Sequence, residues 1–208
     1  MLQDDLAAAR AATTALLAHL DALTPRELAG PSLLPSWSRG HVVAHLAGNA
    51  RSHVRMLEGC LAGEVRDQYA DGAAGRDAAI DALAGCWDAM DEAHWARDVR
   101  PLDAPPRPAT ELVWSRWKEV LVHRVDLDAG CSWRHWPDAF AIRLLHVLVD
   151  RDDLPAMTLD AGRGLLGVGG GGGVVTGTPA ALAAWLIGRS DGTDLSADGA
   201  LPQVPPWT

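Results

Sequence analysis

Apolar residues recur at helical spacing in four long segments that fill the first 130 residues of the chain. This recurrence at every third or fourth position predicts amphipathic helices. The predicted helices run from Asp4 or Asp5 to Leu23, from the Ser36-Trp37-Ser38 segment to about Leu61, from Asp77 to about Arg97, and from Leu112 to Gly130, with Thr110 as the cap of the last one. Because proline-rich connectors separate them, residues 1–130 are predicted to form an antiparallel four-helix bundle.

The pattern changes after Gly130. Two shorter helical segments, 137–150 and 179–187, alternate with runs typical of strands, AMTLDAG and VVTG. Five consecutive glycines, Gly169 to Gly173, lack the spacing and the lysine of a phosphate-binding loop, so we interpret them as a turn between strands. Residues 131–208 are therefore predicted to form a small α+β lobe, in a chain that is mainly α-helical.

The fourth predicted helix carries a face of potential metal ligands. Glu119, His123 and Asp126 follow one another at helical spacing. Glu and His one turn apart can both ligate a divalent ion such as zinc. A third ligand must come from another segment, and the second helix offers His45, with His41 as the alternative. The same face lies opposite the apolar arc of the helix, a position that is also typical of a solvated surface, so the pattern alone leaves both interpretations open.

The apolar side of this helix contains one basic residue, Arg124. An unpaired guanidinium among apolar side chains would be costly. We therefore expect Arg124 to pair with a carboxylate or to point into a cleft.

Composition narrows the set of partners. The chain has 208 residues and a net charge of −9, with 18 lysines and arginines in total, so it offers no basic surface for nucleic acid. No apolar run approaches the roughly 20 residues that span a bilayer. The N-terminal segment carries acids where a signal peptide would carry basic residues, which predicts a cytoplasmic protein. The three cysteines, Cys60, Cys86 and Cys131, are too few and too widely spaced for a disulfide framework, so we expect free thiols.

Several segments also carry a family resemblance. The segments PSLLPSWSRGHVVAHLAGNA, GEVRDQYADGAAGRDAAIDALAG, EVLVHRVDLDAG and VTGTPAALAAWLIGRSDG resemble, in this order, the mycothiol-dependent maleylpyruvate isomerase family of the DinB-like superfamily. The resemblance implies a DinB-like four-helix bundle that binds one divalent metal, usually zinc, through His45, Glu119 and His123. It also implies a small C-terminal lobe over the site. The C-terminal part is short for the family, and its glycine run is unusual.

The resemblance further implies a metal-dependent enzyme that uses the low-molecular-weight thiol mycothiol. The reaction would be cis–trans isomerisation of a maleyl-type double bond or thiol S-transfer to a small electrophile. Arg189 matches the family's C-terminal arginine, a contact for a substrate carboxylate. Arg76 is a second candidate cation, and Asp126 would orient His123 or ligate weakly. The alternatives are a non-enzymatic metal-binding bundle and a metal-dependent hydrolase that uses bound water. A monomer and a homodimer are both compatible with the sequence.

Overall fold

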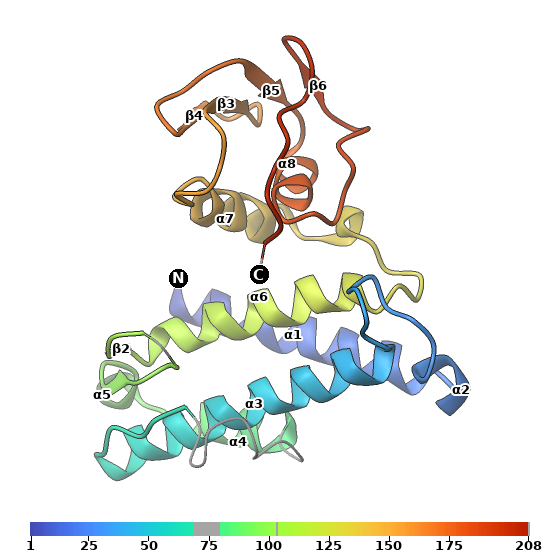
Figure 1. Cartoon of the computed structure of the whole chain (residues 1–208). Coiled ribbons are helices and arrows are strands. Elements are labelled where there is room, and N and C mark those ends of the chain that lie inside the picture. Colours follow the sequence, from blue (N-terminus) through green and yellow to red (C-terminus); the bar gives the residue numbers. More distant parts are fainter. Residues whose placement is uncertain (69–79, 103, 208) are drawn as a thin grey trace. The chain divides into compact units, whose positions relative to one another are not determined.

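The computed structural model describes residues 1–68, 80–102 and 104–207. The chain divides into two units, Met1–Asp128 and Ala129–Thr208, which are described separately below (Figure 1). About half of the described residues lie in helices, and a small sheet accompanies the helices of the second unit. Among the described helices, none combines the length and the apolar character that a membrane crossing requires.

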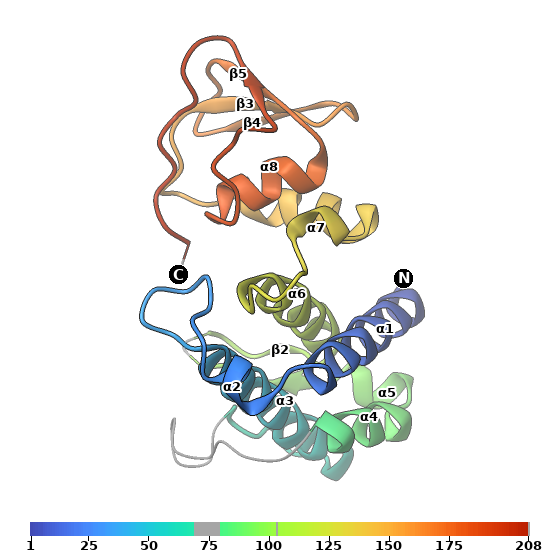
Figure 2. The same cartoon turned by 90° about the vertical axis from the view of Figure 1, so that its right-hand side faces the viewer.

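The longer helices of the first unit pack against one another and form most of it. Those in its described part are α1 Leu2–Asp21, α3 Arg39–Ala62, α4 Ile80–Ala89 and α6 Thr110–Asp126. Helix α6 packs against both α1 and α3, and α3 also packs against α4 (Figure 2). Shorter elements connect them: α2 Pro25–Leu28, α5 Glu92–Trp95, and the antiparallel strands β1 Asp98–Val99 and β2 Arg107–Pro108. The contact of α6 with α3 places side chains from both helices around one site.

Local chemistry sets both ends of α3. The side chain of Ser38 accepts a hydrogen bond from the backbone N–H of His41 at 3.2 Å, which satisfies one of the free donors at the helix start. At the other end, Gly63 has a φ of 78°, in the left-handed region that glycine adopts readily. The predicted start near Ser38 and the predicted end at about Leu61 are therefore confirmed.

The third predicted helix is wrong in its second half. Helix α4 ends at Ala89, and α5 then begins at Glu92. Asp91 separates them because its side chain accepts a hydrogen bond from the N–H of His94 at 2.8 Å and caps α5 as a new helix. The predicted start at Asp77 lies outside the described residues.

The fourth predicted helix also differs at both ends. Ala109 precedes α6, and Thr110 is its first helical residue, so the predicted Thr110 cap is wrong. The helix ends at Asp126, two residues before Asp128 adopts a positive φ of 48°, and the side chain of Arg39 binds the carbonyl oxygens that follow. Its Nε donates to Leu127 at 2.6 Å and its Nη2 to Asp128 at 2.7 Å. These bonds also tie the end of α6 to the start of α3.

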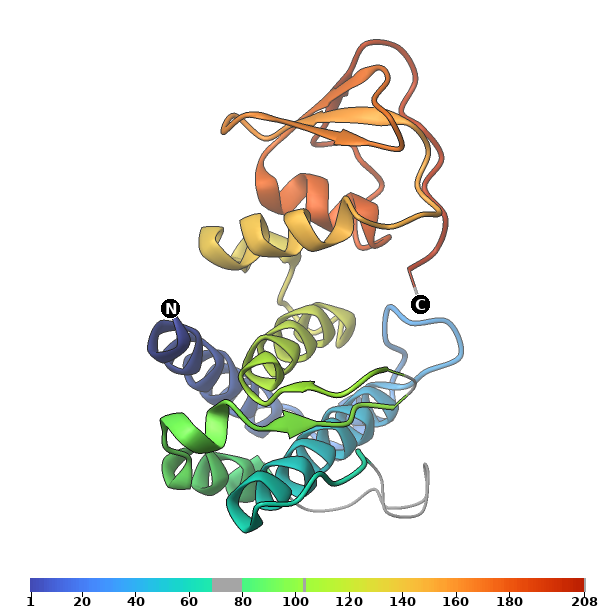
Figure 3. The same cartoon turned by 90° about the vertical axis from the view of Figure 1, so that its left-hand side faces the viewer.

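The second unit combines two helices with a sheet. Helices α7 Asp138–Leu148 and α8 Pro179–Leu186 pack against each other, after a short 3-10 helix at Trp133–His135. The sheet lies on one side of this pair (Figure 3) and has the order β4-β3-β5-β6. Its strands are β3 Met157–Asp160, β4 Leu165–Val168, β5 Val174–Thr176 and β6 Ser196–Ala197. Strands β3 and β5 match the predicted runs AMTLDAG and VVTG.

The glycine run joins β4 to β5, so its prediction as a turn between strands is confirmed. These two strands lie on opposite edges of β3, and the run must therefore cross the chain before β3. A Cβ on Gly172 would lie 2.6 Å from the carbonyl oxygen of Ala156, closer than real contacts allow. Gly169 has a φ of 57° and a close contact with Ala156 as well. Gly169 and Gly172 are thus required by close backbone approach.

Candidate metal centre

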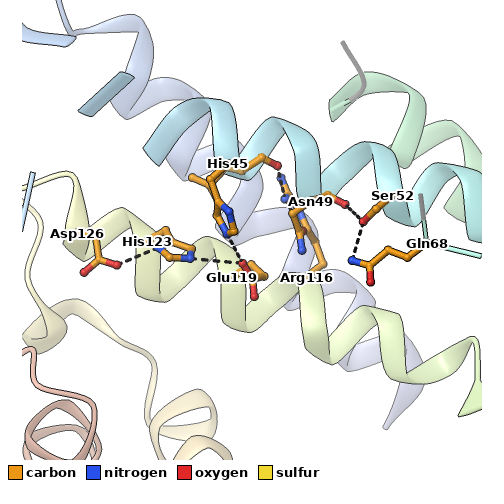
Figure 4. A network of polar contacts seen from close by, with 9 residues as sticks. His45, Asn49, Ser52, Gln68, Arg116, Glu119, His123 and Asp126 are labelled. Carbon is orange, nitrogen blue, oxygen red and sulfur yellow. Dashed lines mark hydrogen bonds and ion pairs between the residues drawn. The ribbon is translucent and has the colours of Figure 1, made fainter. Parts of the chain in front are cut away.

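Three potential metal ligands meet where α3 faces α6. His45 extends from α3, and Glu119 and His123 extend from α6 one turn apart (Figure 4). Glu119 Oε2 lies 3.1 Å from His45 Nε2 and 3.4 Å from His123 Nε2. Each residue offers one potential ligand atom, and these three atoms all lie within 4.8 Å of one another. The structure therefore brings together the three residues that the sequence analysis selected.

The spacing of these atoms suits a small divalent ion. Two ligands at about 2.1 Å from a tetrahedral zinc ion lie about 3.4 Å from each other. The two measured separations, 3.1 and 3.4 Å, are close to that value. Two imidazole nitrogens and one carboxylate oxygen also form a donor set that zinc accepts, with a position left for a further ligand. The donor types and the two separations that involve Glu119 thus fit the expected metal.

Asp126 holds His123 from the side opposite Glu119. Its Oδ2 lies 2.9 Å from His123 Nδ1, and the aspartate side chain is wholly buried. With Nδ1 engaged by the carboxylate, Nε2 is the nitrogen that faces Glu119. Such a carboxylate fixes the tautomer and the orientation of a histidine that ligates a metal. Asp126 therefore has the geometry of an orienting residue, one of the two roles expected from the sequence.

The charges of the cluster support one another. Burial alone would lower the pKa of His123, but its hydrogen bonds to Asp126 and Glu119 raise the pKa to about 9. Burial would likewise raise the pKa of Glu119, but hydrogen bonds from His123 and His45 bring it well below its ordinary value. Glu119 is therefore a carboxylate at neutral pH, the form that binds a cation.

The Trp37 indole borders the cluster. Its ring centre lies 5.7 Å from that of His45 and 6.3 Å from that of His41, both in edge-on geometry. The residue is 36% exposed. A hydrogen bond of 2.9 Å from Leu33 N–H to the backbone oxygen of Asp126 ties the Trp37 loop to the end of α6. A large apolar ring is thus held at the exposed edge of the cluster.

A buried arginine lies one turn from Glu119, and the sequence analysis missed it. Arg116 has no exposed surface, and its Nη1 donates to Leu46 O and Asn49 Oδ1, each at 2.9 Å. Arg124, the arginine that stood out in the apolar pattern of the helix, is only half-buried. A helical wheel could not separate the two because the polar face of α6 is itself covered by α3. The three-residue spacing to Glu119 was the only available signal.

The other predicted site residues have different surroundings. His41 lies outside the ligand cluster defined among the described residues, and its Nδ1 accepts a hydrogen bond from Ser38 N–H at 3.0 Å. Arg189 belongs to the second unit, where its Nη1 donates to the Ile187 oxygen at 2.7 Å. Arg76 lies outside the described residues. The roles expected of the two arginines therefore stay predictions.

All three cysteines are thiols outside any disulfide, as predicted. Cys60 is buried, and Cys86 and Cys131 are partly exposed. Burial raises the pKa of the Cys60 and Cys86 thiols. Both therefore favour the protonated form, which is a poor nucleophile.

Comparisons with known proteins agree with this fold. The chain superimposes on the crystal structure of the mycothiol-dependent maleylpyruvate isomerase with a TM-score of 0.88 and 22% sequence identity, over 100% of this chain and 97% of that chain. A histidine-to-alanine mutant of the mycothiol-dependent maleylpyruvate isomerase gives a TM-score of 0.89 with the same identity and coverage. No curated protein matches the chain in sequence. The model of the family described as mycothiol maleylpyruvate isomerase N-terminal domain matches residues 9–128. The chain therefore belongs to the mycothiol maleylpyruvate isomerase N-terminal domain family.

Proposed function

We propose that the chain is a metal-dependent, mycothiol-using enzyme that catalyses cis–trans isomerisation of a maleyl-type double bond. The cluster of His45, Glu119 and His123, in a chain of this family, carries the proposal. According to this proposal, the first unit is a DinB-like antiparallel four-helix bundle. Its helices α3 and α6 hold one divalent ion, for which we propose zinc. The second unit is the small α+β lobe of the same enzyme.

The chain's own residues would prepare the site for a thiol. Glu119 supplies a negative charge, and Asp126 directs the Nε2 of His123 towards it. The His45 side chain is 33% exposed, so the cluster can be reached from solvent on that side. A divalent metal bound there would lower the pKa of a thiol that ligates it and so supply thiolate at neutral pH. The Trp37 ring would line the same side of the site.

The reaction itself needs only a reversible addition. The thiolate sulfur adds to one alkene carbon, and the electron pair of the double bond moves onto the conjugated carbonyl as an enolate. The former double bond rotates as a single bond, and the enolate then returns the electron pair, re-forms the double bond and expels the thiolate. The thiol is recovered unchanged, so no further reactant is consumed. A dicarboxylate substrate would also need a cation, and we propose Arg189 for this role because of its match to the family's C-terminal arginine. Arg76 stays a second candidate on sequence grounds.

The test has two steps. Metal analysis of the purified protein should find one divalent ion per chain. Maleylpyruvate should then be isomerised only when both the metal and mycothiol are present, with no S-conjugate accumulating. Accumulation of a conjugate with a small electrophile would instead indicate an S-transferase. Absence of a stoichiometric metal, or a rate independent of the thiol, would contradict the proposal.

A further inference from the structure

Helices α3 and α6 are joined by two polar contacts one turn apart. The first is His45 with Glu119, at 3.1 Å. The second is Asn49 with Arg116, at 2.9 Å (Figure 4). Asn49 follows His45 by one turn of α3, and Arg116 precedes Glu119 by one turn of α6, so the helices run in opposite directions at this point. The second contact thus joins the same two helices one helical turn away from the first.

Arg116 makes a further bond that fixes the backbone itself. Its Nη1 also donates to the main-chain oxygen of Leu46, the residue directly after His45, at 2.9 Å. Both protons of this nitrogen therefore form hydrogen bonds to α3, one to the backbone of Leu46 and one to the side chain of Asn49. A rigid planar group anchored at two points restricts both the separation and the sliding of the two helices.

The same guanidinium is poorly satisfied elsewhere. Arg116 has no exposed surface, and its Nε and Nη2 find no hydrogen-bond partner among the described residues. Burial also lowers its pKa, to about 10, although the charge of Glu119 opposes this effect. A buried charge with unused donors carries a large desolvation penalty. Replacing such a group together with its polar partner by apolar residues of similar volume is often neutral or stabilising. Folding stability alone therefore does not explain this arginine.

We propose that Arg116 is a positioning residue for the metal centre, which holds the His45 helix and the Glu119 helix at the separation their ligand atoms require, without adding to folding stability. The inference rests on the proposed metal site. It makes metal affinity and stability respond in different ways to the same substitution. A residue that only supported the fold would change both together.

The experiment compares zinc affinity with the thermal stability of the metal-free protein. Zinc affinity is measured by competition with a chromophoric chelator. Arg116→Met should weaken zinc binding by about tenfold or more, the size of effect that partners of metal ligands produce. The double variant Arg116→Met/Asn49→Leu removes both members of the contact and leaves no orphaned amide. It should unfold at the wild-type temperature or higher, yet bind zinc as weakly as Arg116→Met.

Arg51 provides a matched control. It also lies on α3, and its three guanidinium nitrogens likewise have buried positions with no partner among the described residues. Arg51→Met should leave zinc affinity unchanged. Wild-type affinity in Arg116→Met, or in the double variant, would overturn the inference, as would a parallel loss of stability and affinity in the double variant. Failure of the wild-type protein to bind zinc would instead overturn the proposed function.

Discussion

His123 Nδ1 lies 2.9 Å from Oδ2 of Asp126, a carboxylate that sits one turn further along α6 and has no exposed surface. This contact leaves Nε2 as the nitrogen that faces Glu119. We predict that Asp126→Ala weakens zinc binding about 10- to 100-fold, because the imidazole loses the group that fixes its orientation and tautomer. Asp126→Asn keeps an oxygen acceptor and should weaken binding less. Calorimetric zinc titration of the three proteins measures the order. Equal affinities would show that the carboxylate does not orient the ligand.

His45 and His41 provide a matched pair of substitutions on one helix. We predict that His45→Ala loses most bound zinc, as should His123→Ala, because each removes a ligand atom beside Glu119. His41→Ala should keep its zinc. It should lose about 0.5–2 kcal/mol of stability, since the His41 ring accepts a hydrogen bond from Ser38 N–H at the start of α3. Metal analysis and thermal unfolding of the variants check both parts. Zinc loss in His41→Ala but not in His45→Ala would mean that the ligand is His41.

The elements that the sequence predicted well are those set by local chemistry. Ser38 and Gly63 act on their own backbone neighbours, so the ends of α3 could be inferred from residue type and position. Asp91 uses similar chemistry, but a single aspartate within an apolar pattern does not reveal whether a helix continues or restarts. Strands β4 and β6 were missed because each takes its place from pairing with another strand.

The site shows the same division. Spacing alone placed Glu119 and His123 together, since both belong to one helix. His45 could be preferred to His41 only through the family resemblance, because the alignment of α3 with α6 is a property of packing. Arg116 was missed for that reason as well. Its burial depends on α3 covering the polar face of α6, where Leu46 and Asn49 receive its hydrogen bonds.

His53 should make the protein sensitive to acid. Burial, together with the positive charges of Arg116 and Arg107, lowers the pKa of His53 to about 3. The unfolded chain takes up this proton near pH 6.5, whereas the folded protein does not until about pH 3. Stability is therefore fully present above pH 6.5 and falls below it, by at most about 1.4 kcal/mol per pH unit.

Replacing His53 tests this account. We predict that His53→Gln flattens the decrease in unfolding free energy between pH 6.5 and 5, whatever its effect at pH 7. Urea unfolding of the metal-free wild type and variant at several pH values measures the two slopes. An unchanged slope in the variant would assign the acid sensitivity to other groups.

Arg189 offers two explanations that kinetics can separate. It directly follows Gly188 at the end of α8, donates to the Ile187 oxygen at 2.7 Å, and has its guanidinium 5.9 Å from the Trp207 ring centre. These contacts are sufficient for a purely structural residue of the second unit. The proposed role as a cation for a substrate carboxylate makes a different demand, because a guanidinium can bind a carboxylate through two parallel hydrogen bonds and an ammonium cannot.

We therefore predict that Arg189→Lys raises the KM for a maleyl dicarboxylate about tenfold and leaves zinc content and the unfolding temperature unchanged. The loss should shrink for a substrate in which one carboxylate is replaced by a neutral amide, since that substrate no longer needs the two-pronged contact. Steady-state kinetics with both substrates give the comparison. A structural role would instead lower the unfolding temperature and affect both substrates equally. Wild-type kinetics in Arg189→Ala would exclude a role in substrate binding, because alanine retains neither the charge nor the hydrogen bonds that the role requires.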